Sequence, residues 1–262
     1  MEFVLIAVVA MGAALLTFFS GFGLGTILMP VFALFFPVEI AIALTAVVHL
    51  LNNLFKVSLV WKDISYKTVL LFGIPAMLAA FAGALALSRL SVSSFTLAYK
   101  IGQKHMETDV VNLVIAALLI LFAVFELNKR LVNLSLPKKY LPLGGVLSGF
   151  FGGISGHQGA LRSLFLLKAG LTKESFIATG ISIAILIDIS RITVYGSSFL
   201  FSKIESIKDE RSLAFVIVAC LSAFIGSFFG KRLLKKVTIR NVQIVVSLLL
   251  LVFALLLGTG II

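Results

Sequence analysis

Long apolar runs separated by short polar stretches follow one another along the whole chain. They cover residues 3–36, 40–60, 67–88, 109–127, 141–167, 174–200, 212–229 and 239–261. A helix needs about 20 predominantly apolar residues to cross a bilayer, and most of the runs reach that length. The short alternating segments of a transmembrane β-barrel are absent from the sequence. The pattern therefore predicts an all-α polytopic membrane protein.

The first and fifth runs are too long for one crossing, and glycines interrupt both. As a single straight helix the first run would be about 51 Å long, against a hydrocarbon core of about 30 Å. The interruptions are GFGLG at 21–25 and GGISGHQG at 152–159. We therefore predict two broken hairpins, in which the chain enters the membrane, breaks at the glycines and returns as a shorter helix.

The two halves of the chain carry matching patterns. Placing Lys56 on Arg191 aligns LLNNLFKVSLV (50–60) with ILIDISRITVY (185–195), and most aligned pairs are conservative. Matched polar positions inside apolar helices indicate internal duplication better than apolar similarity alone. We predict two repeats, each a glycine-broken helical hairpin plus three transmembrane helices. Their predicted bounds are 1–130 and 141–262, with a basic connecting loop at 131–140.

Lysine and arginine concentrate in alternate loops. If each broken hairpin returns to its own side, one face carries 13 basic residues, in the loops 61–67, 128–140, 168–173 and 230–240. The other face carries 6, in 201–211 and in 89–108, where residues 90–108 are a predicted interfacial linker. The positive-inside rule places the richer face in the cytoplasm. Each repeat then has an odd number of crossings, and the two repeats are inverted relative to each other.

The composition agrees with a membrane location and argues against other classes. The chain is 60% hydrophobic and only 13% charged, and its net charge of +11 comes mainly from those loops. The positive-inside rule explains this charge better than nucleic-acid binding does. Because the start of the chain has no basic region before its first apolar run, we expect that run to be retained. Cys220 is the single cysteine and lies in an apolar run, so we expect a packing residue.

Three basic residues lie inside the predicted membrane segments: Lys56, Arg162 and Arg191. A charge at the bilayer centre costs a few kcal/mol, so such residues usually have a function. Lys56 continues a polar stripe with His49 and Asn53, at spacings of four and seven residues along a helix.

A second stripe, Asp188, Arg191 and Tyr195, has spacings of three and seven residues. Two stripes that meet between inverted repeats would line a polar pocket. Two simpler explanations stay open: Lys56 could extend its amine to the interface, and Asp188 with Arg191 could be a buried ion pair that holds helices together.

The excess of buried positive charge predicts an anionic ligand. Asp188 is the one clear anion among the membrane segments, since Glu39, Glu126 and Glu174 lie at segment ends and are expected at the interface. A helix that starts within the membrane also presents free N–H groups and the positive end of its dipole. Glycine permits such a break and allows a ligand close to the backbone. Alternatively, the glycines serve close helix packing and His49 is a core residue.

Other kinds of site lack support in the sequence. The three histidines, one cysteine and scattered carboxylates have no metal-ligand spacing, and no nucleophile motif or cofactor motif occurs. GFGLG follows no strand and so is not a dinucleotide fingerprint, and an ATP-binding motif is absent. We expect neither an enzyme, nor a metal, nor a cofactor.

The stretches SGFGLGTILMP (20–30), NNLFK (52–56) and GVLSGFFGGISGHQGALRSLFLLKAGLTKESFIATG (145–180) suggest a family. They resemble the TauE/SafE-type sulfite exporters, also called the 4-toluene sulfonate uptake permease group, over nearly the whole chain. The resemblance implies a multi-pass carrier of the bacterial-type inner membrane that moves sulfite, sulfonates or related sulfur oxyanions.

We predict a secondary carrier, surrounded by membrane lipid, that moves a small anion. We expect this anion to bind between the two glycine breaks. The candidate substrate-binding residues are Gly21, Gly23, Gly25, His49, Asn53, Lys56, Gly153, Ser155, Gly156, His157, Gln158, Gly159, Arg162, Asp188 and Arg191. Backbone N–H groups, Gln158 and Ser155 would donate hydrogen bonds. Histidine titrates near neutral pH, so His49 and His157 are the candidates for coupling to protons. A passive anion channel and a non-transporting ligand-binding protein are the alternatives, and an oligomer is compatible with the sequence.

Overall fold

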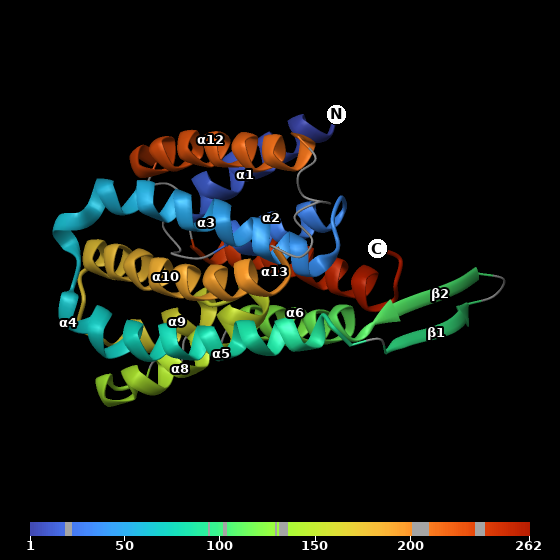
Figure 1. Cartoon of the computed structure of the whole chain (residues 1–262). Helices are drawn as coiled ribbons and strands as arrows, with labels where there is room; N and C mark the ends of the chain where they lie inside the picture. The colour runs from blue at the N-terminus through green and yellow to red at the C-terminus, as the bar shows by residue number, and fades with distance from the viewer. Residues whose placement is uncertain are drawn as a thin grey trace.

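The computed structural model describes residues 1–18, 23–93, 95–101, 104–128, 130, 136–200, 210–233 and 239–262. The first half contains α1 (Glu2–Thr17), α2 (Leu24–Ala33), α3 (Val38–Val60), η1 (Trp61–Asp63), α4 (Tyr66–Thr68), η2 (Val69–Gly73), α5 (Ile74–Leu90) and α6 (Val110–Leu127). The second contains η3 (Lys138–Tyr140), α8 (Leu141–Ser155), α9 (Gly159–Leu166), α10 (Lys173–Tyr195), η4 (Gly196–Leu200), α12 (Glu210–Leu233) and α13 (Ile239–Gly258). The helices form one bundle, from which a β-hairpin extends at one end (Figure 1).

Both predicted helix breaks are present. The first long run is divided into α1 and α2, and the fifth into α8 and α9. Gly23 precedes α2 with a φ of 117°, and Gly156 follows α8 with a φ of 79°. Glycine occupies this left-handed region without the steric cost that a side chain would bring, which is why the chain can turn there. Gly21 lies outside the described residues.

The predicted interfacial linker is instead an antiparallel hairpin of β1 (Thr96–Ile101) and β2 (Lys104–Asp109). The larger apolar or aromatic residues of β1, Leu97, Tyr99 and Ile101, occupy every second position, which is the period of a strand. A search for runs of about 20 apolar residues does not detect that period. The Tyr99 hydroxyl donates to the Thr259 carbonyl at 2.7 Å and ties the hairpin to the end of α13. The fold is therefore helical with one small β element.

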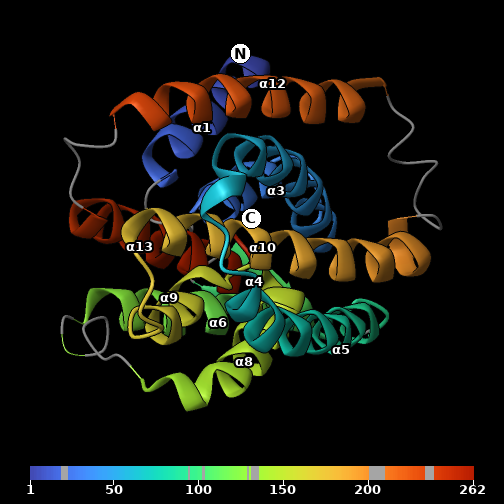
Figure 2. The same cartoon turned by 90° about the vertical axis from the view of Figure 1, so that its left-hand side faces the viewer.

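Helices from the two halves of the chain pack against each other in pairs. α1 packs on α12 and α5 packs on α8, at opposite sides of the bundle, while α3 with α10 and α6 with α13 lie between them (Figures 1 and 2). The two halves therefore share one core.

Small residues permit the closest of these contacts. Gly145, Gly149 and Gly153 follow one another at four-residue spacing on α8, and a Cβ on Gly149 would lie only 2.0 Å from the carbonyl oxygen of Ala76 in α5. Gly226 of α12 approaches the backbone of α1 in the same way. Such small-residue stripes are characteristic of helix pairs within membranes, where close backbone packing stabilises association.

The helices have the length and composition of membrane spans. Among the described residues, five helices are long and apolar enough to cross a bilayer: Val38–Asp63, Tyr66–Leu90, Val110–Leu127, Lys173–Ser198 and Leu213–Lys231. Their outward surfaces carry large exposed side chains such as Leu78, Leu121 and Leu221. The chain is thus a helical membrane protein with several crossings.

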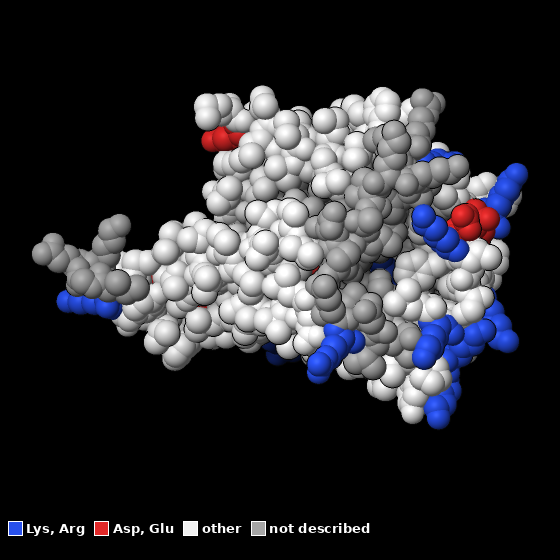
Figure 3. Space-filling view, turned by 180° about the vertical axis from the view of Figure 1, so that it is seen from behind, with Lys and Arg blue, Asp and Glu red and all other residues white. Residues whose placement is uncertain are grey.

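Basic side chains gather at the end of the bundle opposite the hairpin (Figure 3). There the Lys231 amine donates to the Leu59 carbonyl at 3.0 Å, which brings the end of α12 beside the end of α3. A Cβ on Gly170 would lie 2.8 Å from the Lys138 amine, so the loops before α8 and α10 also meet. Described parts of the four basic loops therefore share one end of the molecule.

Candidate functional site

Four polar side chains form a chain of contacts where α3 packs on α10. Asp188 is fully buried, and its two carboxylate oxygens have different partners. Oδ2 lies 2.6 Å from Nδ1 of His49, and Oδ1 accepts from Arg191 Nε at 3.0 Å and from Nη2 at 2.8 Å. Because a carboxylate only accepts, Nδ1 of His49 donates, and the amide of Asn53 lies 3.4 Å from its Nε2. The two predicted stripes therefore do meet.

The guanidinium of Arg191 also borders the second helix break. A Cβ on Gly156 would lie 2.9 Å from Nη1 of Arg191, so only glycine leaves this approach free. Asp188 engages Nε and Nη2 of Arg191, whereas Nη1 is buried and has no hydrogen-bond partner among the described residues. The ion pair that the sequence left open exists, but it leaves one guanidinium donor unused.

Gln158 provides a second buried donor in the same break. Its backbone carbonyl accepts from the Ser148 hydroxyl at 2.9 Å, which fixes the turn between α8 and α9. Its Oε1 accepts from Nη1 of Arg162 at 3.4 Å, while its Nε2 is buried without a hydrogen-bond partner in the described part of the chain. An unpaired buried donor costs about 1–3 kcal/mol, so two of them beside one break call for an acceptor.

A small cavity lies between the two breaks, and we call it the anion cavity. It is lined by Gly23, Gly25, Thr26, His49, Gly156, Gln158, Gly159 and Arg162. Its volume of about 10 Å³ is room for a single water molecule. The breaks from both halves of the chain thus border the same small space.

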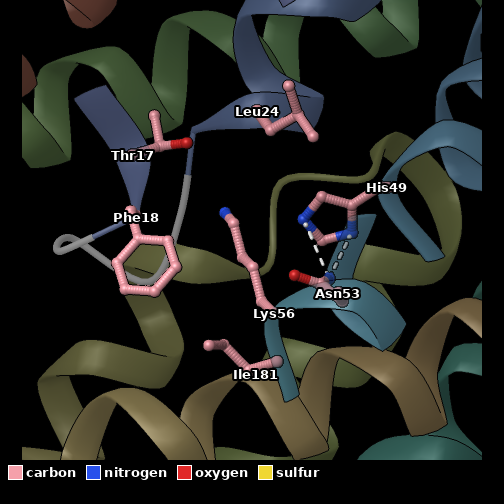
Figure 4. A pocket seen from close by; sticks show the side chains of 7 residues that line it. All are labelled: Thr17, Phe18, Leu24, His49, Asn53, Lys56 and Ile181. Atoms are coloured by element: carbon pink, nitrogen blue, oxygen red, sulfur yellow. Dashed lines mark hydrogen bonds between the residues drawn. The ribbon is translucent and has the colours of Figure 1, made fainter. Parts of the chain in front are cut away.

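A second small cavity continues on the other side of His49 and contains Lys56 (Figure 4). Lys56 extends from α3 between Phe18 and His49, with its amine 5.5 Å from the centre of the Phe18 ring. When the amide of Asn52 is oriented so that its oxygen and its nitrogen are both hydrogen-bonded, the oxygen accepts from the Lys56 amine at 3.3 Å. The nitrogen then donates to the Ser227 hydroxyl at 2.8 Å. Lys56 is only 4% exposed, so its amine is covered by the protein rather than extended into the surroundings.

His157 faces a third, collapsed cavity, which has no room for a water molecule, rather than the anion cavity. Its Nδ1 lies 2.9 Å from the carbonyl oxygen of Ser155, and its ring stacks on Phe122 with centroids 6.1 Å apart. Glu126, which we expected at the interface, is 4% exposed, lines this cavity and accepts from Ser247 at 3.0 Å. Glu126 lies one residue before the end of α6, and there it is covered by α13, which supplies Ser247.

Two other predicted residues have structural contacts. Gly153 packs against the backbone of Ala80 in α5, and its carbonyl accepts from the Tyr195 hydroxyl. The Ser155 hydroxyl donates to the carbonyl of Phe151 one turn earlier, at 3.0 Å, so its proton is already used. These contacts favour packing and helix-end roles for both residues.

The sequence did not single out two residues that lie at or beside these cavities. Thr26 lines both the anion cavity and the cavity of His157, and Asn52 is fully buried beside Lys56. The one available signal was the Asn52–Asn53 pair inside an apolar run. Among the described residues, no group of three or more His, Cys, Asp or Glu has the arrangement of a metal site.

The site is strongly positive for its degree of burial. Lys56, Arg162 and Arg191 are 4%, 2% and 1% exposed, and Asp188 is the carboxylate that faces Arg191. Removing such charges from water is costly unless opposite charge accompanies them. The arrangement can therefore accept a small anion through two donors, with additional positive charge around it.

Comparison with known proteins identifies one family. The family model described as sulfite exporter TauE/SafE matches residues 5–257, nearly the whole chain. Neither the curated proteins nor the solved structures contain a significant match.

Proposed function

Since the chain belongs to the TauE/SafE sulfite exporter family of membrane transporters, we propose that it is a secondary carrier for a small sulfur oxyanion such as sulfite or a sulfonate. We place it in a plasma membrane of the bacterial inner-membrane type. Transport of this kind changes no covalent bond of the substrate, so the protein's task is to bind the anion and to change the side from which it is accessible.

One observation carries the proposal: the two buried donors without a partner beside the second break. Nη1 of Arg191 and Nε2 of Gln158 both lack an acceptor within the described residues. An oxyanion offers several acceptor oxygens and would satisfy both donors. Charge-assisted hydrogen bonds of this kind are about twice as strong as neutral ones.

Electrostatics supports the same ligand. Arg162 borders the anion cavity, and Lys56 lies in the neighbouring cavity across His49. Positive charge without matching negative charge at membrane depth is stabilised when an anion enters. The Gly23 and Gly156 turns allow the backbone to come close to that anion from both halves of the chain.

The order of helix pairs supports two inverted repeats, residues 1–130 and 141–262 joined by 131–140. A twofold axis that relates the halves would exchange the pair α1–α12 with the pair α8–α5. It would also make α3–α10 and α6–α13 symmetric pairs, and these are the pairs that occur. In this proposal the anion cavity lies at the repeat interface, as in other carriers with inverted repeats.

The small volume of the anion cavity favours a carrier over a passive channel. Space for one water molecule is too small for a sulfur oxyanion, so the surrounding helices must separate before it binds. Gly23 stands directly before α2 and Gly156 shortly before α9, so these two glycines are the places where α2 and α9 can move relative to α1 and α8. We propose that this movement opens the site to one side of the membrane at a time.

Flux of radiolabelled sulfite into liposomes that contain the purified protein tests the function. A carrier gives saturable uptake that unlabelled sulfite inside the liposomes accelerates by exchange. A channel gives uptake that does not saturate in this way, and a ligand-binding protein gives none. Absence of flux for sulfite and for simple sulfonates would refute the proposed function.

A further inference from the structure

The cavity of His157 contains two titratable side chains outside the anion cavity. It lies between α2, α6 and α9, and its lining residues are Thr26, Phe122, Glu126, His157, Gly159 and Ala160. Glu126 and His157 are 4% and 6% exposed, and the anion-binding arrangement above uses neither of them. Carboxylates and histidines buried within the membrane are the side chains with which carriers relay protons.

The hydrogen bonds of His157 leave one nitrogen ready to take a proton. A carbonyl oxygen only accepts, so Nδ1 of His157 donates its proton to the carbonyl of Ser155. In the neutral ring the lone pair then lies on Nε2, which is buried and has no hydrogen-bond partner in the described part of the chain. His49, by contrast, uses its ring nitrogens in contacts with Asp188 and Asn53.

Glu126 supplies the acidic member of the pair. One of its oxygens accepts from the Ser247 hydroxyl of α13, which holds the carboxyl group at the wall of the cavity. Thr26 of α2 brings a hydroxyl group to the wall of the cavity, and the positive charge of Arg191 on α10 acts against a proton on His157. A proton bound to either side chain would thus lie at the wall of this cavity, near the positive charge of the anion site.

The cavity shares walls with the anion cavity. Thr26 of α2 and Gly159 of α9 line both spaces. These helices follow the two breaks, so a movement that opens one cavity changes the other. Two sites that bias the same movement are coupled, and the coupling acts equally in both directions.

We propose that Glu126 and His157 form a proton-binding site, separate from the anion cavity, that couples anion movement to the proton gradient. The site takes up one proton from the side to which it is open and releases it on the other side in the same cycle as the anion. The proposal rests on the carrier function proposed above and deepens it.

The test compares sulfite accumulation in proteoliposomes with and without an imposed pH gradient. For one coupled proton, a difference of one pH unit supports up to about tenfold accumulation of the anion. We expect Glu126→Gln, which preserves the contact with Ser247, to lose this accumulation and to retain sulfite exchange. Glu39→Gln serves as the matched control, because Glu39 is also a buried carboxylate but lies at the start of α3, and it should respond like the unmodified protein.

Other outcomes separate this proposal from the proposed function. Accumulation by Glu126→Gln equal to that of the unmodified protein would overturn the proton site, as would a response to a sodium gradient in place of the pH gradient. If Glu126→Gln does not fold, His157→Gln gives the same comparison, and loss of accumulation with retained exchange supports the site. Absence of sulfite exchange in the unmodified protein would instead refute the carrier function.

Discussion

Helices α3 and α10 pack against each other and carry polar residues at positions that the internal alignment matches. In α10, Asp188 precedes Arg191 by three residues and fixes its guanidinium with two hydrogen bonds. In α3, the corresponding residue before Lys56 is the neutral Asn53, and the amine is held by Asn52 and faces the Phe18 ring. At matched positions, α10 thus carries the fixed planar guanidinium of Arg191, whereas α3 carries the less constrained ammonium group of Lys56.

This difference suggests a division of labour between the halves. A guanidinium offers several donors in a fixed fork, so Arg191 can bind Asp188 and still direct Nη1 toward a ligand. An ammonium group on a flexible stem can follow a ligand over a greater range. We therefore expect Arg191 to determine whether the anion binds and Lys56 to modulate how tightly it binds.

Removal of the carboxylate in α10 should have the largest effect on stability. Asp188→Asn leaves Arg191 buried without its charge partner, and loss of one member of a buried pair costs about 3–5 kcal/mol. Reversible unfolding in detergent measures this loss. Asp63→Asn, at an exposed aspartate of η1, should change the free energy of unfolding by less than about 0.5 kcal/mol. Equal effects of the two substitutions would contradict the role of Asp188.

Replacement of the guanidinium should have the next largest effect, on anion affinity. Arg191→Lys keeps the charge but removes the fork, so the anion loses a charge-assisted hydrogen bond of about 1.5–3 kcal/mol. The dissociation constant for sulfite should rise about 10- to 150-fold. A sulfite titration followed by intrinsic fluorescence measures it, with Arg89→Lys at an exposed arginine as the control. An unchanged affinity would remove Arg191 from the site.

Introduction of the missing carboxylate into α3 should have a smaller effect. Asn53→Asp places an anion three residues before Lys56, as Asp188 stands before Arg191. The new charge would neutralise part of the positive field around the site, so we expect sulfite affinity to fall by less than about tenfold. Unchanged or tighter binding, measured by the same titration, would show that Lys56 does not act on the ligand.

The sequence predicted the features that depend on local backbone chemistry and helix period. Glycine marked both breaks, and the spacings along α3 and α10 put His49 on the same face as Asn53 and Asp188 on the same face as Arg191. The meeting of these two faces followed from the proposed symmetry. The β-hairpin was missed because its two-residue period extends over six residues in each strand.

The sequence did not predict which neighbour each side chain selects. A glycine at four-residue spacing has the same appearance in the sequence whether it opens a helix or permits close packing, so the sequence alone does not separate these two roles for Gly153. The Ser155 hydroxyl can donate either to a ligand or to the carbonyl one turn before it, and the structure has the second contact. The burial of Glu126 depends on α13, which lies more than 100 residues away in the chain.

The central claim is that a sulfur oxyanion binds to Arg191 and Gln158 at the second break, and Gln158→Glu tests it most directly. The substitution keeps the shape of the side chain and its contact with Arg162, but it replaces the donor with negative charge. For the unmodified protein, sulfite at about 100 times its dissociation constant should stabilise the fold by about 2.7 kcal/mol in thermal unfolding. We predict that Gln158→Glu folds and loses this stabilisation, whereas undiminished stabilisation by sulfite would contradict the account.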